Sequence, residues 1–221
     1  MAWFSWRAEP AAQAIRQYQQ TAGPATDTLA QHCRFLVLDV ETTGLDAAKH
    51  HIVSLGWVEI MQGELALETA RHFLVKPPVS VGQSAIYHGL HDHQLQQALE
   101  LGEVLNIFLQ QAAGAVLVAH HARLEQQFLQ TACQRVFGNS PRFRLLDTMQ
   151  IEWQRLLQQN KVVKSDGLRL AQCLSRHQLP SGLFHHALED AYSCALLLLC
   201  QIKQSRSNST TLGDLYRLSA G

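Results

Sequence analysis

The chain has 221 residues, of which 47% are hydrophobic and 16% charged, a composition typical of a globular protein with its own core. Eighteen Lys and Arg residues balance eighteen Asp and Glu residues, which argues against coating nucleic acid through bulk charge but allows a small phosphate-binding site. The five scattered cysteines, the lack of a signal peptide and the lack of an apolar run of ~18 residues predict a cytoplasmic protein with reduced thiols and no membrane partner.

A polar segment precedes the apolar part of the chain. A helix is predicted for residues 10–20, because Pro10 stands near its start, and "TAGPATDT" follows as a loop. We interpret residues 1–33 as an N-terminal helical extension and residues 34–203 as the main domain. Residues 204–221 are interpreted as a polar tail that stays loose until a short helix near its end.

Three segments rich in Val, Leu, Ile and Phe come next and predict strands at residues 34–40, 51–60 and 69–77. Short turns join them, which favours an antiparallel meander. Helices and strands then alternate. Strands are predicted at 115–120 and 143–147, and helices at 102–113, 123–137, 148–159, 167–177 and 187–203. This order predicts an α/β fold with a mixed sheet, three antiparallel strands followed by two parallel ones, flanked by helices.

Two carboxylates end the first predicted strand, in "FLVLDVETTGL" at residues 35–45. Side chains two apart on a strand point to the same face, so Asp39 and Glu41 project together. Like charges this close repel unless a cation lies between them, and hard oxygen ligands suit Mg²⁺ or Mn²⁺. The alternative is that Glu41 begins a solvated turn that Asp39 caps.

Glu125 is a third candidate, in "VAHHARLEQQFL" just after the predicted strand 115–120. It stands in the first turn of a predicted helix. A site with two metal ions needs more than two carboxylates, which favours a ligand role. Acidic residues are also common in first turns because they complement the helix dipole, so this structural interpretation stays open.

Asp190 is a fourth candidate, in "FHHALEDAYSCALLLL" at the start of an otherwise apolar helix. Because that helix buries most of its surface, Asp190 is expected at its interior side or at the edge of a site. His185 precedes it by five residues, in the loop that leads into the helix. A histidine beside a metal cluster is able to act as a general base toward water.

Twelve histidines are the oddity of the composition, including the run "HGLHDH" at residues 88–93. Structural zinc would need paired ligands, and these histidines follow no recognised Cys/His spacing. Most of them are interpreted as surface or loop residues.

Together, three of these segments resemble the exonuclease motifs of the DEDD superfamily, histidine branch, in the family's order: "DVETTGL" at 39–45, "VAHHARLEQQFL" at 118–129 and "HHALEDA" at 185–191. "YHGL" at 87–90 resembles a further segment of that family, to which the proofreading epsilon subunit of bacterial replicative DNA polymerase belongs. The resemblance covers about residues 34–200 and implies a ribonuclease-H-like fold.

The resemblance also implies roles for individual residues. It makes Asp39, Glu41 and Asp190 ligands of two Mg²⁺ or Mn²⁺ ions, with His185 as the general base. The second motif departs from the family, because Glu125 stands where the family usually carries Asp. Residues that approach the terminal nucleotide are, by the same resemblance, Thr42, Thr43, Leu45 and His88.

The function implied is metal-dependent hydrolysis of the terminal phosphodiester at the 3′ end of single-stranded DNA or RNA, with DNA favoured, releasing nucleoside 5′-monophosphates. A DNA polymerase subunit is a candidate partner. The alternative is a module of the same fold that binds nucleic acid or a polymerase and has lost efficient catalysis, and Glu125 is the feature that favours it.

Overall fold

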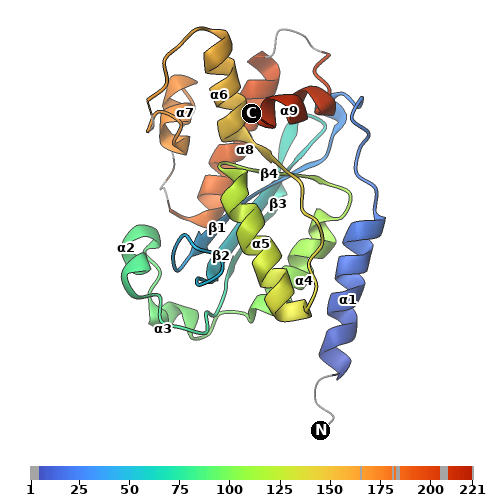
Figure 1. Ribbon diagram of the computed structural model, residues 1–221, viewed down its shortest axis with the longest axis vertical. Coiled ribbons are helices and arrows are strands. Elements are labelled where there is room, and N and C mark those ends of the chain that lie inside the picture. The colour runs from blue at the N-terminus through green and yellow to red at the C-terminus, as the bar shows by residue number, and fades with distance from the viewer. Residues whose placement is uncertain (1–4, 165, 181, 183–184, 205–208, 221) are drawn as a thin grey trace.

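The computed structural model describes residues 5–164, 166–180, 182, 185–204 and 209–220. Within these residues, five strands form a single sheet in the order β3-β2-β1-β4-β5 (Figure 1). They are β1 (Phe35–Thr42), β2 (Ile52–Met61), β3 (Glu64–Leu74), β4 (Val116–Ala119) and β5 (Leu145–Asp147). β2 is antiparallel to both β1 and β3, whereas β4 is parallel to both β1 and β5. The predicted mixed sheet is confirmed.

The helices follow the predicted order, with two additional short ones at residues 85–88 and 92–95. They are α1 (Ser5–Gln20), α2 (Ala85–His88), α3 (Asp92–Leu95), α4 (Leu101–Ala112), α5 (Ala122–Phe137), α6 (Thr148–Gln158), α7 (Leu170–Arg176), α8 (Ala187–Gln204) and α9 (Leu212–Ser219). Single 3-10 turns lie at Ala30–His32 and Gly82–Ser84. None of the described helices is long and apolar enough to cross a membrane.

β3 begins earlier than residue 69, where the sequence analysis starts it. Gln62 and Gly63 both have positive φ and form a two-residue turn, so Met61 pairs with Glu64 immediately after it. Such a turn suits the right-handed twist of the two strands that it joins. The strand therefore reaches the turn, and its first residues, Glu64 to Leu67, show no regular alternation of buried and exposed side chains.

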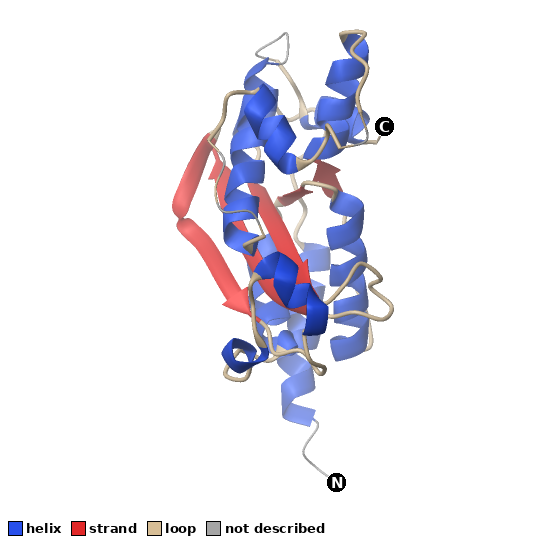
Figure 2. Cartoon of the chain, turned by 90° about the vertical axis from the view of Figure 1, so that its left-hand side faces the viewer, coloured by secondary structure: helices blue, strands red, loops and turns tan. Residues whose placement is uncertain are grey.

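Alternate residues of β1 belong to two separate parts of the core. Leu36, Leu38 and Val40 pack with residues of α4 and α5. Phe35 and Val37 pack on the opposite face, with Cys194, Leu198 and other residues of α8 and α9. Figure 2 shows the strands along one side of the molecule with helices beside them. Since side chains alternate along a strand, Asp39 and Glu41 lie on the face that α8 covers.

The short helix expected near the end of the chain is α9. The Thr211 hydroxyl accepts a hydrogen bond from the backbone N–H of Asp214, which caps the helix, and Leu212 and Leu215 are buried in the core. The backbone N–H of Leu212 donates to the carbonyl of Thr28, so the segment before β1 pairs with the segment before α9. Residues 205–208 of the polar tail lie outside the described residues.

Candidate active site

Asp39 and Glu41 lie at the carboxyl end of the central strand. Asp39 pairs with Gly56 of β2, and Glu41 pairs with Ser54. Gly56 has no side chain, and a Cβ there would lie 2.3 Å from the backbone nitrogen of Leu188. Glycine at this position therefore lets the first turn of α8 approach the sheet beside Asp39.

Asp190 completes a group of three carboxylates. It lies in the first turn of α8, above the part of the sheet that carries Asp39. One carboxylate oxygen from each of Asp39, Glu41 and Asp190 lies within 4.8 Å of the other two. The three residues that the sequence assigns to one site thus converge from β1 and α8.

Glu125 approaches this group from α5 but stands outside it. Its side chain is 3% exposed, and among the described residues its Oε2 has no hydrogen-bond partner. The start of α5 is held by Asp147, whose two carboxylate oxygens accept hydrogen bonds from the backbone N–H groups of His121 and Ala122, at 3.0 Å each. The same carboxylate accepts from Met149 N and caps α6. Asp147 therefore fixes the turn that presents Glu125.

The electrostatics of the four carboxylates favour a cation between them. Burial, followed by the charges of Glu125, Asp190 and Glu41, raises the pKa of Asp39 well above its ordinary value. Burial and the charge of Asp190 raise the pKa of Glu41 to about 7, and burial is also the main cause that raises the pKa of Glu125 to about 8. Within the described part of the chain, no Lys or Arg forms an ion pair with any of them. Hard divalent cations suit such an oxygen-rich, unneutralised group.

His185 lies at the edge of the carboxylate group. It is exposed, its φ is 69°, and its backbone N–H donates to Oδ2 of Asp190 at 2.8 Å. This hydrogen bond lowers the pKa of Asp190, against the larger effect of burial, which raises it. The imidazole is thus free to face solvent beside a carboxylate of the site.

The four residues expected to contact a nucleotide differ in their exposure and in their hydrogen bonds. The Thr42 hydroxyl donates to the carbonyl of Gly44, and the Thr43 hydroxyl accepts from the backbone N–H of His51, so both stabilise the loop between β1 and β2. Leu45, at the tip of that loop, is 80% exposed. His88 is buried, its Nδ1 accepts from Leu90 N and its Nε2 lies 3.1 Å from the Ser84 hydroxyl. Of the four, Leu45 presents the most surface to a ligand.

A protein-family model described as Exonuclease matches residues 36–198, which include all four carboxylates and His185. The chain belongs to this exonuclease family. The match confirms the resemblance to DEDD-superfamily 3′-to-5′ exonucleases. The family implies divalent metal ions, and the carboxylate group offers the ligands that such ions need.

One curated relative of this exonuclease is the DNA polymerase III PolC-type of Thermotoga petrophila, which is 29% identical over 194 residues. The matched region makes up 87% of this chain and 14% of that protein. The exonuclease chain therefore spans about one seventh of the length of this relative.

Two solved structures share the fold of the exonuclease. Exonuclease X in complex with 5′ overhanging duplex DNA superimposes with a TM-score of 0.62 at 20% identity, over 82% of this chain and 98% of that one. The nuclease domain of 3′hExo, a DEDDh family member bound to rAMP, gives a TM-score of 0.66 at 16% identity, over 80% of this chain and 94% of that one. Together they confirm the expected ribonuclease-H-like α/β fold.

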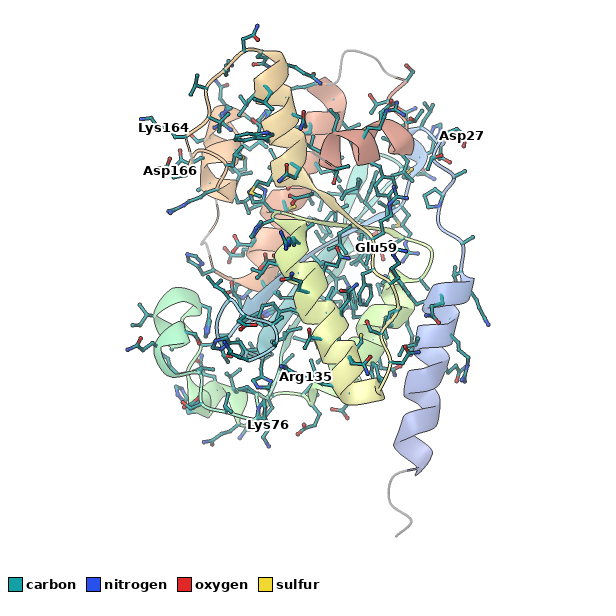
Figure 3. The ribbon with its side chains drawn as sticks, viewed as in Figure 1. Asp27, Glu59, Lys76, Arg135, Lys164 and Asp166 are labelled. Carbon is teal, nitrogen blue, oxygen red and sulfur yellow. The ribbon has the colours of Figure 1, made fainter. Side chains whose placement is uncertain are left out.

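Three positioning residues of the exonuclease were missed in the sequence analysis. Asp147 is the last residue of β5, just as Asp39 lies near the end of β1. The sequence "DT" after an apolar segment indicates such a strand end and would have predicted this residue. Gly56 carries no such signal, because its role depends on α8. Arg135 of α5 donates to the carbonyls of Ala47, Ala48 and His50 and so holds the loop that carries Leu45. Figure 3 labels Arg135 near this loop.

Proposed function

We propose that this chain is a 3′-to-5′ exonuclease that hydrolyses the terminal phosphodiester of single-stranded nucleic acid and releases nucleoside 5′-monophosphates. One observation carries the proposal: the carboxylates of Asp39, Glu41 and Asp190 converge from β1 and α8, and among the described residues no Lys or Arg forms an ion pair with them. Glu125 of α5 lies outside this group but close enough to raise the pKa of Asp39. A structural role would favour paired charges, because an unpaired buried carboxylate is costly.

We assign Asp39, Glu41, Glu125 and Asp190 as the residues that would hold two divalent ions, Mg²⁺ or Mn²⁺. The unpartnered Oε2 of Glu125 supports this assignment, since a ligand oxygen needs a free lone pair. When bound, such ions lower the pKa of an attacking water and stabilise charge on the departing 3′ oxygen. With such ions bound, the carboxylates would fix the position of the scissile phosphate at the carboxyl end of β1.

His185 is assigned as the general base. Its ring is exposed beside Asp190, where it would accept the proton of the attacking water. The bond from its backbone N–H to Asp190 keeps it next to the carboxylates while leaving the ring nitrogens available. Thr42, Thr43, Leu45 and His88 are assigned to the binding of the terminal nucleotide, with Leu45 as the apolar surface for a base or sugar.

Glu125 gives some support to a second candidate, a module that binds nucleic acid without efficient catalysis. Glu has one methylene more than the Asp usual in the family. Its side chain is nonetheless buried and close enough to Asp39 to raise the pKa of that carboxyl. We favour the enzyme, because a residue released from catalysis has no need to keep its charge in such a place.

Substrate and partner are proposed on the same basis. The solved neighbours include one bound to overhanging duplex DNA and one bound to rAMP, and the curated relatives are polymerases. We propose single-stranded 3′ ends as the substrate, DNA in preference to RNA, and a DNA polymerase subunit as a partner.

The test is hydrolysis of single-stranded DNA and RNA, labelled at either the 3′ or the 5′ end, with Mg²⁺ or Mn²⁺. We expect immediate release of the 3′ label as a mononucleotide. Asp39→Asn should lower the rate on the order of 100-fold, while the matched change of the exposed Asp27 should leave it unchanged. Release of the 5′ label first, or equal rates for Asp39→Asn and wild type, would refute the proposal.

A further inference from the structure

A hollow of about 420 Å³ lies between α6 and α7, and its use is not explained by the carboxylate site. Lys161, Val162, Lys164, Asp166 and Arg176 are among its lining residues, and we call it the α6–α7 hollow. Figure 3 labels Lys164 and Asp166 at the left edge of the molecule, on the segment that leads into α7. Both lysines are exposed, and neither forms an ion pair within the described ranges.

Arg176 adds positive charge to the wall of the hollow. Its guanidinium donates to Oε1 of Glu152 at 3.0 Å and to the carbonyl of Gly167 at 2.7 Å. Glu152 is fully buried and also contacts Arg155 and His177, so its one carboxylate is shared by two guanidinium groups and an imidazole. Three cationic side chains, Lys161, Lys164 and Arg176, therefore line the hollow, and Asp166 is the one acidic side chain among its described lining residues.

His120 connects the start of α5 with Leu168, which follows Gly167 of the hollow's wall. Nε2 of His120 donates to the carbonyl of Leu168 at 2.8 Å, and its Nδ1 lies 2.9 Å from the hydroxyl of Thr148. Burial lowers the pKa of His120, which keeps the ring neutral and fits this donor and acceptor pattern. His120 directly follows β4 and precedes the first turn of α5, which carries Glu125. One hydrogen bond of His120 thus joins the segment next to the hollow to the turn that presents Glu125.

We propose that the α6–α7 hollow binds the phosphate backbone of the strand whose 3′ end occupies the carboxylate site, upstream of the terminal phosphodiester. This inference rests on the proposed function. The chain is neutral overall and its active site is acidic, so backbone phosphates need a local group of cations. Lys161 and Lys164 supply it, and Val162, which is 98% exposed, offers an apolar contact for a sugar or base.

The experiment compares two substrates in two variants. The first substrate is a single-stranded 20-mer of DNA or RNA, and the second is the p-nitrophenyl ester of thymidine 5′-monophosphate, whose one phosphate reaches the active site alone. The variant is Lys161→Glu/Lys164→Glu. Its matched control is Arg16→Glu/Arg142→Glu, with the same change of charge at two exposed residues, on α1 and between α5 and β5, neither of which is among the lining residues of the hollow.

We expect the variant to raise KM for the 20-mer by about tenfold and to reduce the dependence of log kcat/KM on log salt by about 1.4, since two phosphate contacts are lost. The turnover of the ester should stay within about twofold of the wild-type value, because the contacts of the active site with this small substrate are unchanged. Equal KM values in variant and control would overturn the proposal, as would a parallel loss of ester turnover. Inactivity of the wild type on both substrates would refute the nuclease function instead. Fluorescence anisotropy of a labelled 20-mer would then test binding at the hollow, and an affinity of the variant within tenfold of that of the control would overturn the proposal.

Discussion

Glu125 is the residue at which this chain departs from the usual pattern of its family. The additional methylene moves the carboxylate further from the backbone of α5. The side chain is nevertheless buried, and one of its oxygens has no hydrogen-bond partner among the residues that the structure describes. Its backbone is held by Asp147 through the first N–H groups of the helix. The site is therefore shaped around the longer side chain, which is consistent with a ligand position and not with a solvated helix terminus.

If Glu125 is a ligand, Glu125→Gln should reduce the rate of nucleotide release by about tenfold or more, because it removes charge at constant size. Glu125→Asp should keep substantial activity while needing more metal, since the shorter side chain falls short of the ion. Initial rates of both variants across Mg²⁺ and Mn²⁺ titrations test this. A wild-type rate in Glu125→Gln at every metal concentration would leave a site of three carboxylates, with Glu125 worth at most ~1 kcal/mol to the helix.

The raised carboxyl pKa values predict that the metal-free protein is destabilised as the pH rises. Burial and neighbouring charge raise the pKa of Glu41 from 4.5 to about 7 and that of Glu125 to about 8. The folded state thus holds protons that the unfolded chain releases. The contribution of these two carboxyl groups to the free energy of unfolding is therefore fully present below about pH 4.5 and is lost as the pH rises through about 7 to 8.

Thermal unfolding in EDTA between pH 5 and pH 8.5 measures this effect. Asp39→Asn should unfold at the same or a higher temperature than the wild type at pH 8, because it removes one of the repelling charges. The difference between the two proteins should shrink toward pH 5. A variant that is less stable than the wild type at pH 8 would indicate that Asp39 stabilises the fold.

At the scale of elements, the packing of α8 on β2 brings Asp190 to Asp39. Gly56→Ala would place a Cβ 2.3 Å from the backbone of Leu188, so α8 must move away from the sheet. We expect an unfolding free energy lower by about 1–3 kcal/mol and a rate of nucleotide release lower by about tenfold or more. Gly23→Ala is the matched control, since its Cβ would have an ordinary contact at 3.9 Å. Unchanged activity in Gly56→Ala would mean that the close approach of α8 to this glycine is not needed to position Asp190 beside Asp39.

At the scale of the whole molecule, the sequence predicts those features that depend on local pattern. The apolar run 34–40 ends at two carboxylates two residues apart, and strand periodicity places both on one face. α8 is apolar over most of its length, and its first turn carries Asp190. Such patterns identify the mixed sheet of three antiparallel and two parallel strands, most helix positions and the three carboxylates that meet.

The remaining features depend on contacts between distant parts of the chain. The bonds of Arg135 to the loop at 47–50, of His120 to Leu168 and of Asp147 to His121 join residues that no local pattern connects. α2 and α3 were not predicted, because each has only four residues, too few to show a helical period. These contacts fix the loops around the site, and sequence periodicity does not record them.

The central claim is that Asp39, Glu41, Glu125 and Asp190 form one site for divalent cations. Anomalous diffraction from a crystal soaked in Mn²⁺ tests it most directly, because the metal is located independently of any activity. We predict anomalous peaks among these four carboxylates, with the principal peak between Asp39, Glu41 and Asp190, and loss of that peak in Asp39→Asn. A soaked wild-type crystal with manganese bound elsewhere and no peak at these carboxylates would contradict the claim.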